Sequence, residues 1–93
     1  MSTEERSPRD PYTIALGQRL RQARNSRDLS LQDVADEGVL SAPALGSYER
    51  GARAISARNL AAVAHFLDVD GAWLLMGPDA GQPDIVIGLE VSQ

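Results

Sequence analysis

The sequence predicts an all-α domain of five short helices, followed by one short β-strand near the C-terminus. Five segments with helical character each begin at a Ser or an Asp that suits a helix N-cap. Glycines follow three of these segments, whereas a run close to the C-terminus alternates apolar residues with other types. A chain of 93 residues has the length of one domain. We therefore expect a polar segment over 1–10, a helical domain over 11–77 and a tail over 78–93.

The first helix is predicted over residues 11 to about 27. Asp10 suits its N-cap, and the proline that follows fits the first helical position, where a missing N–H costs little. Apolar residues at helical spacing mark the side that faces the core, namely Leu16, Leu20 and Ala23. Three arginines are expected on a solvated surface of this helix: Arg19, Arg21 and Arg27.

The second and third helices are predicted over residues 31–36 and 41–50. Each begins at a serine cap, and the first of these serines has an aspartate three residues later, which is the spacing of a capping box. A glycine follows each helix. Leu45 and Tyr48 have the spacing of a buried side on the third helix. The side left exposed is expected to present Ala42, Pro43, Gly46 and Ser47.

The last two helices also begin at capping residues. Ser56 caps the fourth helix, and Asp70 caps the fifth, which is predicted over about 71–76. Gly77 and the proline after it end the fifth helix. The fourth helix has a buried stripe of Leu60, Val63, Ala64 and Leu67.

The tail has the pattern of a strand over residues 84–91. Its odd positions are all apolar, and two of its even positions are charged. A single strand is not stable by itself, so the segment pairs with its two-fold mate, adds to another protein's sheet, or is disordered. We favour pairing in a homodimer. The residues predicted to form this contact are Ile85, Ile87, Leu89 and Val91.

Composition excludes several classes of function. The chain has no cysteine and one histidine, so it offers neither a disulfide framework nor a metal site, and no cofactor is expected. It also lacks a nucleophile triad, a phosphate-cradling loop and paired carboxylates in a plausible cleft, so we do not expect an enzyme. The N-terminal segment is polar and has no apolar centre, so a cytoplasmic location is expected.

The net charge of −4 is unusual for a nucleic-acid-binding protein. The excess lies at the two ends, because residues 12–77 hold seven arginines and seven acidic residues. All nine basic residues are arginine, whose planar guanidinium group binds phosphate or guanine through two hydrogen bonds. The local placement of these arginines, rather than the net charge, therefore determines whether DNA binding is feasible.

Residues 29–51, LSLQDVADEGVLSAPALGSYERG, have the organisation of a helix-turn-helix. Ala35 is a small residue where the second helix would cross the first, and Gly38 supplies the turn. The ordered set LS(x)4A(x)5S(x)6YERG, with an RxxS link and the ending WLLMG, resembles the Xre/lambda-repressor-like family over about residues 12–77. Within that family, GSYERGARAIS resembles the DNA-binding domain of an actinobacterial developmental regulator.

The resemblance implies a role for each part of this motif. The helix over 41–50 would be the recognition helix, which enters the major groove of double-stranded DNA. Arg50 and Arg53 would grip the sugar-phosphate backbone, and the start of the second helix, near Gln32, would meet a phosphate. The residues of the recognition helix nearest the DNA would be Ser41, Ala42, Pro43, Ala44 and Ser47.

The resemblance also implies a structural pair and shows departures from the family. Arg24 matches the position that pairs with the glutamate ending the recognition helix, here Glu49, and this pair would fix the angle of that helix. The family often has glutamine at the position of Leu31, and glutamine or arginine at Ala42 or Pro43. Direct readout would therefore depend on Ser47, on contacts with thymine methyl groups, and on DNA shape.

We therefore expect a sequence-specific, DNA-binding transcriptional regulator, acting as a dimeric repressor. Two recognition helices about one DNA turn apart would read a palindrome. The alternative is an antitoxin-like or adaptor module that binds a protein partner by adding its C-terminal strand to a sheet. The acidic charge balance and the absence of base-reading side chains favour this alternative.

Overall fold

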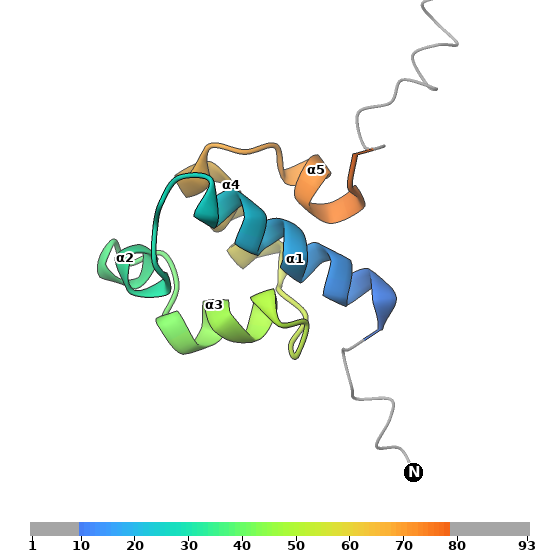
Figure 1. Ribbon diagram of the computed structural model, residues 1–93, viewed down its shortest axis with the longest axis horizontal. Helices are drawn as coiled ribbons and strands as arrows, with labels where there is room; N and C mark the ends of the chain where they lie inside the picture. The colour runs from blue at the N-terminus through green and yellow to red at the C-terminus, as the bar shows by residue number, and fades with distance from the viewer. Residues whose placement is uncertain (1–9, 79–93) are drawn as a thin grey trace, which may run out of the picture.

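The computed structural model describes residues 10–78, and this part of the chain forms five helices and no strand. The all-α fold with five helices is therefore confirmed, and the predicted strand over 84–91 lies outside the described residues. Figure 1 shows the order of the helices. They are α1 (Pro11–Asn25), α2 (Leu31–Asp36), α3 (Ala42–Glu49), α4 (Ala57–Leu67) and α5 (Gly71–Met76).

Each helix begins at its predicted cap. In every case the side chain of the capping residue accepts a hydrogen bond from a backbone N–H of the first turn, which the helix itself cannot satisfy. The capping box at α2 is complete, because Ser30 N also donates to Asp33 Oδ2 at 2.8 Å. The five caps are Asp10, Ser30, Ser41, Ser56 and Asp70.

The helix ends agree closely with the predictions. Helix α1 ends at Asn25, two residues before the predicted end, because Ser26 begins a turn in which Asp28 has a positive φ of 57°. Helix α3 ends at Glu49, one residue before the predicted end, and the predicted glycine after it, Gly51, has a φ of 72° that a side chain would disfavour. The turn between α2 and α3 contains Gly38, with a φ of 79°.

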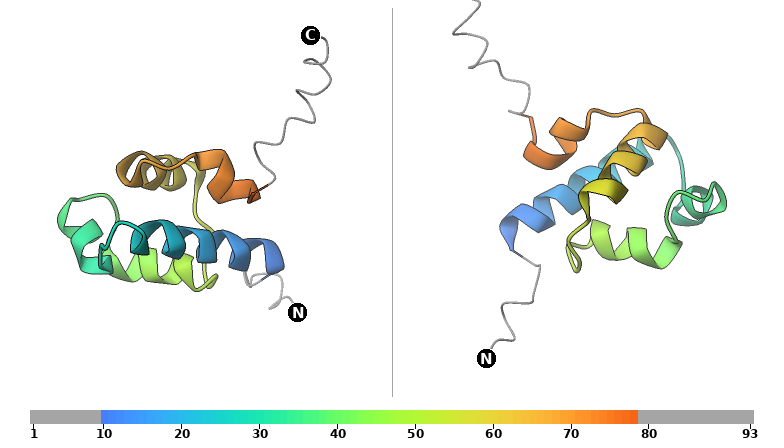
Figure 2. Two further views of the ribbon diagram at one scale, coloured as in Figure 1. Left: turned by 45° about the horizontal axis from the view of Figure 1, so that its top comes forward. Right: turned by 180° about the vertical axis from the view of Figure 1, so that it is seen from behind.

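Helix α1 is the centre of the fold. Figures 1 and 2 show α3 along one side of α1 and the α4–α5 pair on the other, with α2 beside the start of α3. The buried core comes from α1, α3, α4 and α5, and Val34 of α2 and Leu45 of α3 are also fully buried. The main core cluster consists of Leu16, Leu20, Ala23, Tyr48, Val63, Ala64, Leu67 and Leu74.

Gly17 sets the distance between α1 and α3. A Cβ atom built on it would fall on the carbonyl oxygen of Tyr48 and lie 2.6 Å from that of Glu49. The two helix backbones can therefore approach this closely only because residue 17 has no side chain. The periodicity of the sequence did not reveal this requirement.

The expected solvation of Arg19 is wrong. Its guanidinium group donates to the carbonyl oxygens of Leu74, at 2.9 Å from Nε, and of Leu75, at 3.1 Å from Nη2. These carbonyls end α5 and have no partner inside that helix, so a cation from the neighbouring helix binds them. Arg21 and Arg27 are exposed as expected, and Arg27 forms a loose 3.4 Å ion pair with Asp68.

Candidate nucleic-acid interface

Helix α3 has one buried side and one open side. Leu45, Tyr48 and Glu49 are buried against the rest of the domain. On the opposite side, the residues predicted to contact DNA are exposed or half-buried. Ser41, Pro43 and Arg50 are exposed, whereas Ala42 and Ser47 are half-buried.

Two of the residues assigned to the open side lie elsewhere. Gly46 was expected to be exposed, but it is buried, because a Cβ atom built on it would lie 3.1 Å from Nη1 of Arg50 and 3.5 Å from Cδ1 of Leu31. A neighbouring helix and a guanidinium group thus cover its bare backbone. Ala44 packs against the core instead of standing on the open side.

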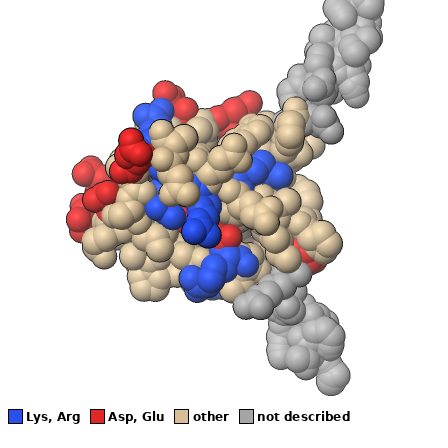
Figure 3. Space-filling view, in the orientation of Figure 1, with Lys and Arg blue, Asp and Glu red and all other residues tan. Residues whose placement is uncertain are grey.

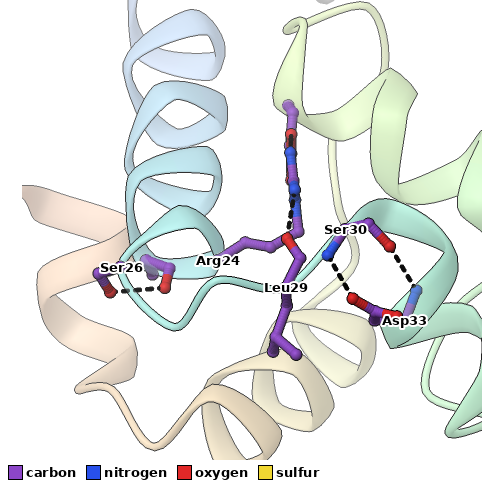
Figure 4. A network of polar contacts seen from close by, with 7 residues as sticks. Arg24, Ser26, Leu29, Ser30 and Asp33 are labelled. Atoms are coloured by element: carbon purple, nitrogen blue, oxygen red, sulfur yellow. Dashed lines mark hydrogen bonds and ion pairs between the residues drawn. The ribbon is translucent and has the colours of Figure 1, made fainter.

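A buried ion pair fixes α3 to α1. Arg24 donates to Glu49 through two bonds, Nε to Oε2 at 2.7 Å and Nη2 to Oε1 at 2.9 Å. The third nitrogen, Nη1, donates to the carbonyl oxygen of Leu29 at 2.6 Å, as Figure 4 shows. The hydrogen bond with Glu49 raises the pKa of Arg24 above its usual value, so the guanidinium group stays charged. One side chain therefore ties together α1, the link to α2, and α3.

The two arginines after α3 lie close to that helix. The guanidinium carbon of Arg53 is 5.1 Å from the centre of the Tyr48 ring, which is a cation–π distance. Arg50 folds back along α3, where its Nη2 donates to the hydroxyl of Ser47 at 3.3 Å. The Tyr48 hydroxyl accepts a bond from Nδ2 of Asn59 in α4, so the ring beneath Arg53 is itself held in place.

The start of α2 offers only part of the predicted phosphate contact. Its capping box uses the backbone amides of Ser30 and Asp33, as Figure 4 shows, and places the Asp33 carboxylate beside the helix start. The side chain of Gln32 donates to Asp36 at 2.9 Å. The amides of Leu31 and Gln32 are therefore the groups at this end that a phosphate could approach.

The charged side chains are unevenly distributed. In Figure 3, most arginines lie across the middle of the face, over α1 and the C-terminal end of α3, whereas most acidic residues lie at its left and upper edges. Figure 1 places α2 at the left edge of the same view, and Asp33 and Asp36 of α2 and its C-cap Glu37 are exposed. Positively and negatively charged side chains are therefore partly separated on this face, which the net charge alone does not show.

Residues 10–78 contain no pocket suited to a small molecule. In the same part of the chain, no group of three or more His, Asp or Glu side chains is placed to hold a metal ion. None of the five described helices combines the length and the apolar character needed to cross a bilayer.

A helix-turn-helix family model matches residues 20–74, which is more than half of the chain, so the chain belongs to this helix-turn-helix family. The fold and the family define the class of lambda-repressor-like, DNA-binding regulators of transcription. The comparison with curated proteins gives no match.

Three solved structures are similar to this chain. The DNA-binding domain of S. venezulae BldD is 40% identical, with a TM-score of 0.66, and the match covers 71% of this chain and 99% of that one. The restriction-modification controller protein C.AhdI from Aeromonas hydrophila is 34% identical, with a TM-score of 0.63 and coverage of 67% and 94%. The clp gene regulator ClgR from Corynebacterium glutamicum is 30% identical, with a TM-score of 0.66 and coverage of 92% and 98%.

Proposed function

We propose that this chain binds specific operator sequences by placing the open side of α3 in the major groove. The observation that carries this proposal is the contrast between the two sides of α3. One side is fixed by the Arg24–Glu49 pair and the contact at Gly17, whereas the other side is open. A recognition helix needs both properties, because base contacts require a helix held at a fixed angle.

The open side would read bases mainly through small side chains. Ala42 and Pro43 fit contacts with thymine methyl groups, and Ser47 offers a hydroxyl that donates or accepts. Arg53 and Arg50, at the end of α3, would bind phosphates on either side of the groove. Ser41 and the amide near Gln32 would meet the backbone at the other end of the motif.

We further propose that the active form is a homodimer that represses transcription. A single α3 covers too few base pairs to select one site in a genome, whereas two copies related by a two-fold axis read a palindrome. The tail residues Ile85, Ile87, Leu89 and Val91 are the predicted dimer contact. The similarity to a clp gene regulator and to a restriction-modification controller protein supports a regulatory role.

Selection from a random pool of duplex DNA tests the proposal. We expect enrichment of a palindrome whose half-sites are about 10 base pairs apart, centre to centre. Pro43→Glu places a carboxylate on the open side of α3 and should weaken binding to the selected site by more than about tenfold, through repulsion by phosphates. Ala61→Glu adds the same charge at an exposed position of α4 and is the matched control.

Two outcomes would overturn this function. The first is that no duplex is retained at low salt. The second is that the Pro43 and Ala61 variants lose affinity equally, because the loss would then reflect total charge alone. Co-purification of a protein partner, together with absent DNA binding, would support the adaptor function that the acidic net charge of −4 favours.

A further inference from the structure

Three large apolar side chains among the described residues are exposed. Tyr12 is 57% exposed, Leu75 38% and Met76 60%. Tyr12 lies two helical turns before Arg19, so both residues share one side of α1, and Arg19 binds the carbonyl oxygens of Leu74 and Leu75 at the end of α5. Figures 1 and 2 likewise place the end of α5 beside the N-terminal half of α1. We call the surface formed by these three residues the α1–α5 patch. Exposed apolar side chains that gather in this way mark a contact surface.

The patch is rigidly built. Arg19 of α1 donates to the carbonyl oxygens of Leu74 and Leu75, which fixes the end of α5 against α1. Arg19 also lies close to Gly77, since a Cβ atom built on Gly77 would be 3.1 Å from Nη1 of Arg19. The backbone that carries Leu75 and Met76 is therefore held against α1.

The described part of the chain ends at this patch. Pro78 is the last described residue and follows Met76 by only two positions. The segment 84–91 begins six residues later, so its first residue stays within about 20 Å of Pro78 even when the link is fully extended. A link this short keeps the segment at a high effective concentration beside the patch.

We propose that the C-terminal segment 84–91 docks on the α1–α5 patch of its own chain. Four of its eight residues are large, apolar and spaced two apart, so in an extended conformation they share one face. An isolated strand needs an apolar surface to be stable, and removal of both apolar surfaces from water is favourable. The docking residues are Ile85, Ile87, Leu89 and Val91.

This docking is compatible with the proposed dimer but does not depend on it. Side chains of a strand stand perpendicular to the sheet, whereas its backbone N–H and C=O groups lie along its edges. The apolar face of the segment can therefore contact the patch while an edge pairs with a second copy. If the segment does not dock there, the alternative is that the α1–α5 patches of two copies of the chain contact each other.

Disulfide scanning in the full-length chain tests the docking, and the absence of native cysteines keeps the background clean. Met76→Cys is combined with a cysteine at each position from 84 to 91 in turn. Met76 is exposed, so this change leaves the core intact. We expect intramolecular cross-links to form at least about tenfold faster at the best odd position than at its even neighbours, because a disulfide requires Cα atoms within about 7 Å and side chains that point together.

The control scan places the fixed cysteine at Ala61, which is exposed on α4, and should show no alternation. Equal rates at odd and even positions of the Met76 scan would overturn the docking, because a free tail cross-links without a period of two. Cross-links that join two chains through Met76→Cys alone would also overturn it and assign the patch to a second copy. DNA binding by the same variants, measured under reducing conditions in which no cross-link forms, tests the proposed function independently of the docking.

Discussion

The two sides of α3 differ in their contacts with the rest of the protein. The inner side contacts α1 at Gly17, carries the bidentate Arg24–Glu49 pair, and places Tyr48 in the main core. The outer side carries Ala42, Pro43 and Ser47, which are small and lie at the surface. The inner side is therefore set by the fold, and the outer side is available for a partner.

This difference shows how one fold serves many target sequences. Changes on the inner side alter the angle or the stability of α3 and so affect every bound site. Changes on the outer side alter base contacts while the angle stays fixed, and so affect one site more than another. The predictions below test this separation, starting with the largest effect.

Glu49→Ala should have the largest effect, because it leaves the charge of Arg24 buried and unpaired. The two side chains are only 10% and 6% exposed, so water cannot replace the carboxylate fully. We expect the free energy of unfolding to fall by about 3 kcal/mol, as measured by urea denaturation. Glu37→Ala, at an exposed glutamate, is the control and should change it little. A loss below about 1 kcal/mol would mean that the pair behaves as a surface ion pair.

Gly17→Ala should come next. The added methyl group overlaps the carbonyl oxygen of Tyr48, and backbone atoms at a helix contact cannot turn aside as a flexible side chain can. We expect a loss of about 2 kcal/mol in the free energy of unfolding. Gly71→Ala is the matched control, because a Cβ atom there meets only the Cβ of Ala64, at an ordinary 3.9 Å. Equal stabilities of the two variants would show that α1 and α3 separate without cost.

The sequence was sufficient to predict the helices because their signals are local. Each cap lies next to the turn that it satisfies, so Ser30, Ser41 and Ser56 could be assigned without any tertiary information. The same holds for the glycine after α3, whose positive φ is a local requirement. The buried stripe of α4 follows from its period alone, and only Leu60 of that stripe is half-buried.

The contacts between helices were not predictable in this way. Arg19 binds carbonyls 55 and 56 positions away, and nothing near it in the sequence distinguishes it from Arg21. Gly17 and Gly46 have ordinary helical neighbours, so their role becomes visible only when the facing helix is in place. For the site, the spacing defined α3 and its open side, whereas the partner of Arg24 came from the family resemblance.

Two substitutions on or next to the outer side of α3 should distinguish contacts with the DNA backbone from contacts with the bases. Arg50→Ala removes an exposed guanidinium at the end of α3, so binding should weaken for all sequences, and the salt slope should fall by about 1. Ser47→Ala should instead change the preference between sites that differ at one base pair, by about 1 kcal/mol. Titrations at several salt concentrations measure both quantities.

Arg27→Ala is the control for charge, because this arginine follows the C-terminal end of α1 and pairs loosely with Asp68, whereas Gly51, next to Arg50, lies against Ile14 near the start of α1. An unchanged salt slope for the Arg50 variant would remove Arg50 from the DNA interface. A uniform loss of affinity for the Ser47 variant would show that its hydroxyl supports α3 or Arg50 instead of reading a base.

The smallest effect concerns the capping box at the start of α2. Hydrogen bonds from the backbone and the side chain of Ser30 lower the pKa of Asp33 below its usual value. A carboxyl group whose folded pKa is lowered stabilises the protein above its unfolded pKa of about 4, and this contribution disappears as the pH falls through the folded pKa. Asp33→Asn should therefore lower the Tm slightly at pH 7, and the difference from the parent chain should shrink as the pH falls below the unfolded pKa and through the lowered folded pKa. Thermal melts at a series of pH values test this, and a difference that persists at the lowest pH would assign the role of residue 33 to shape instead of charge.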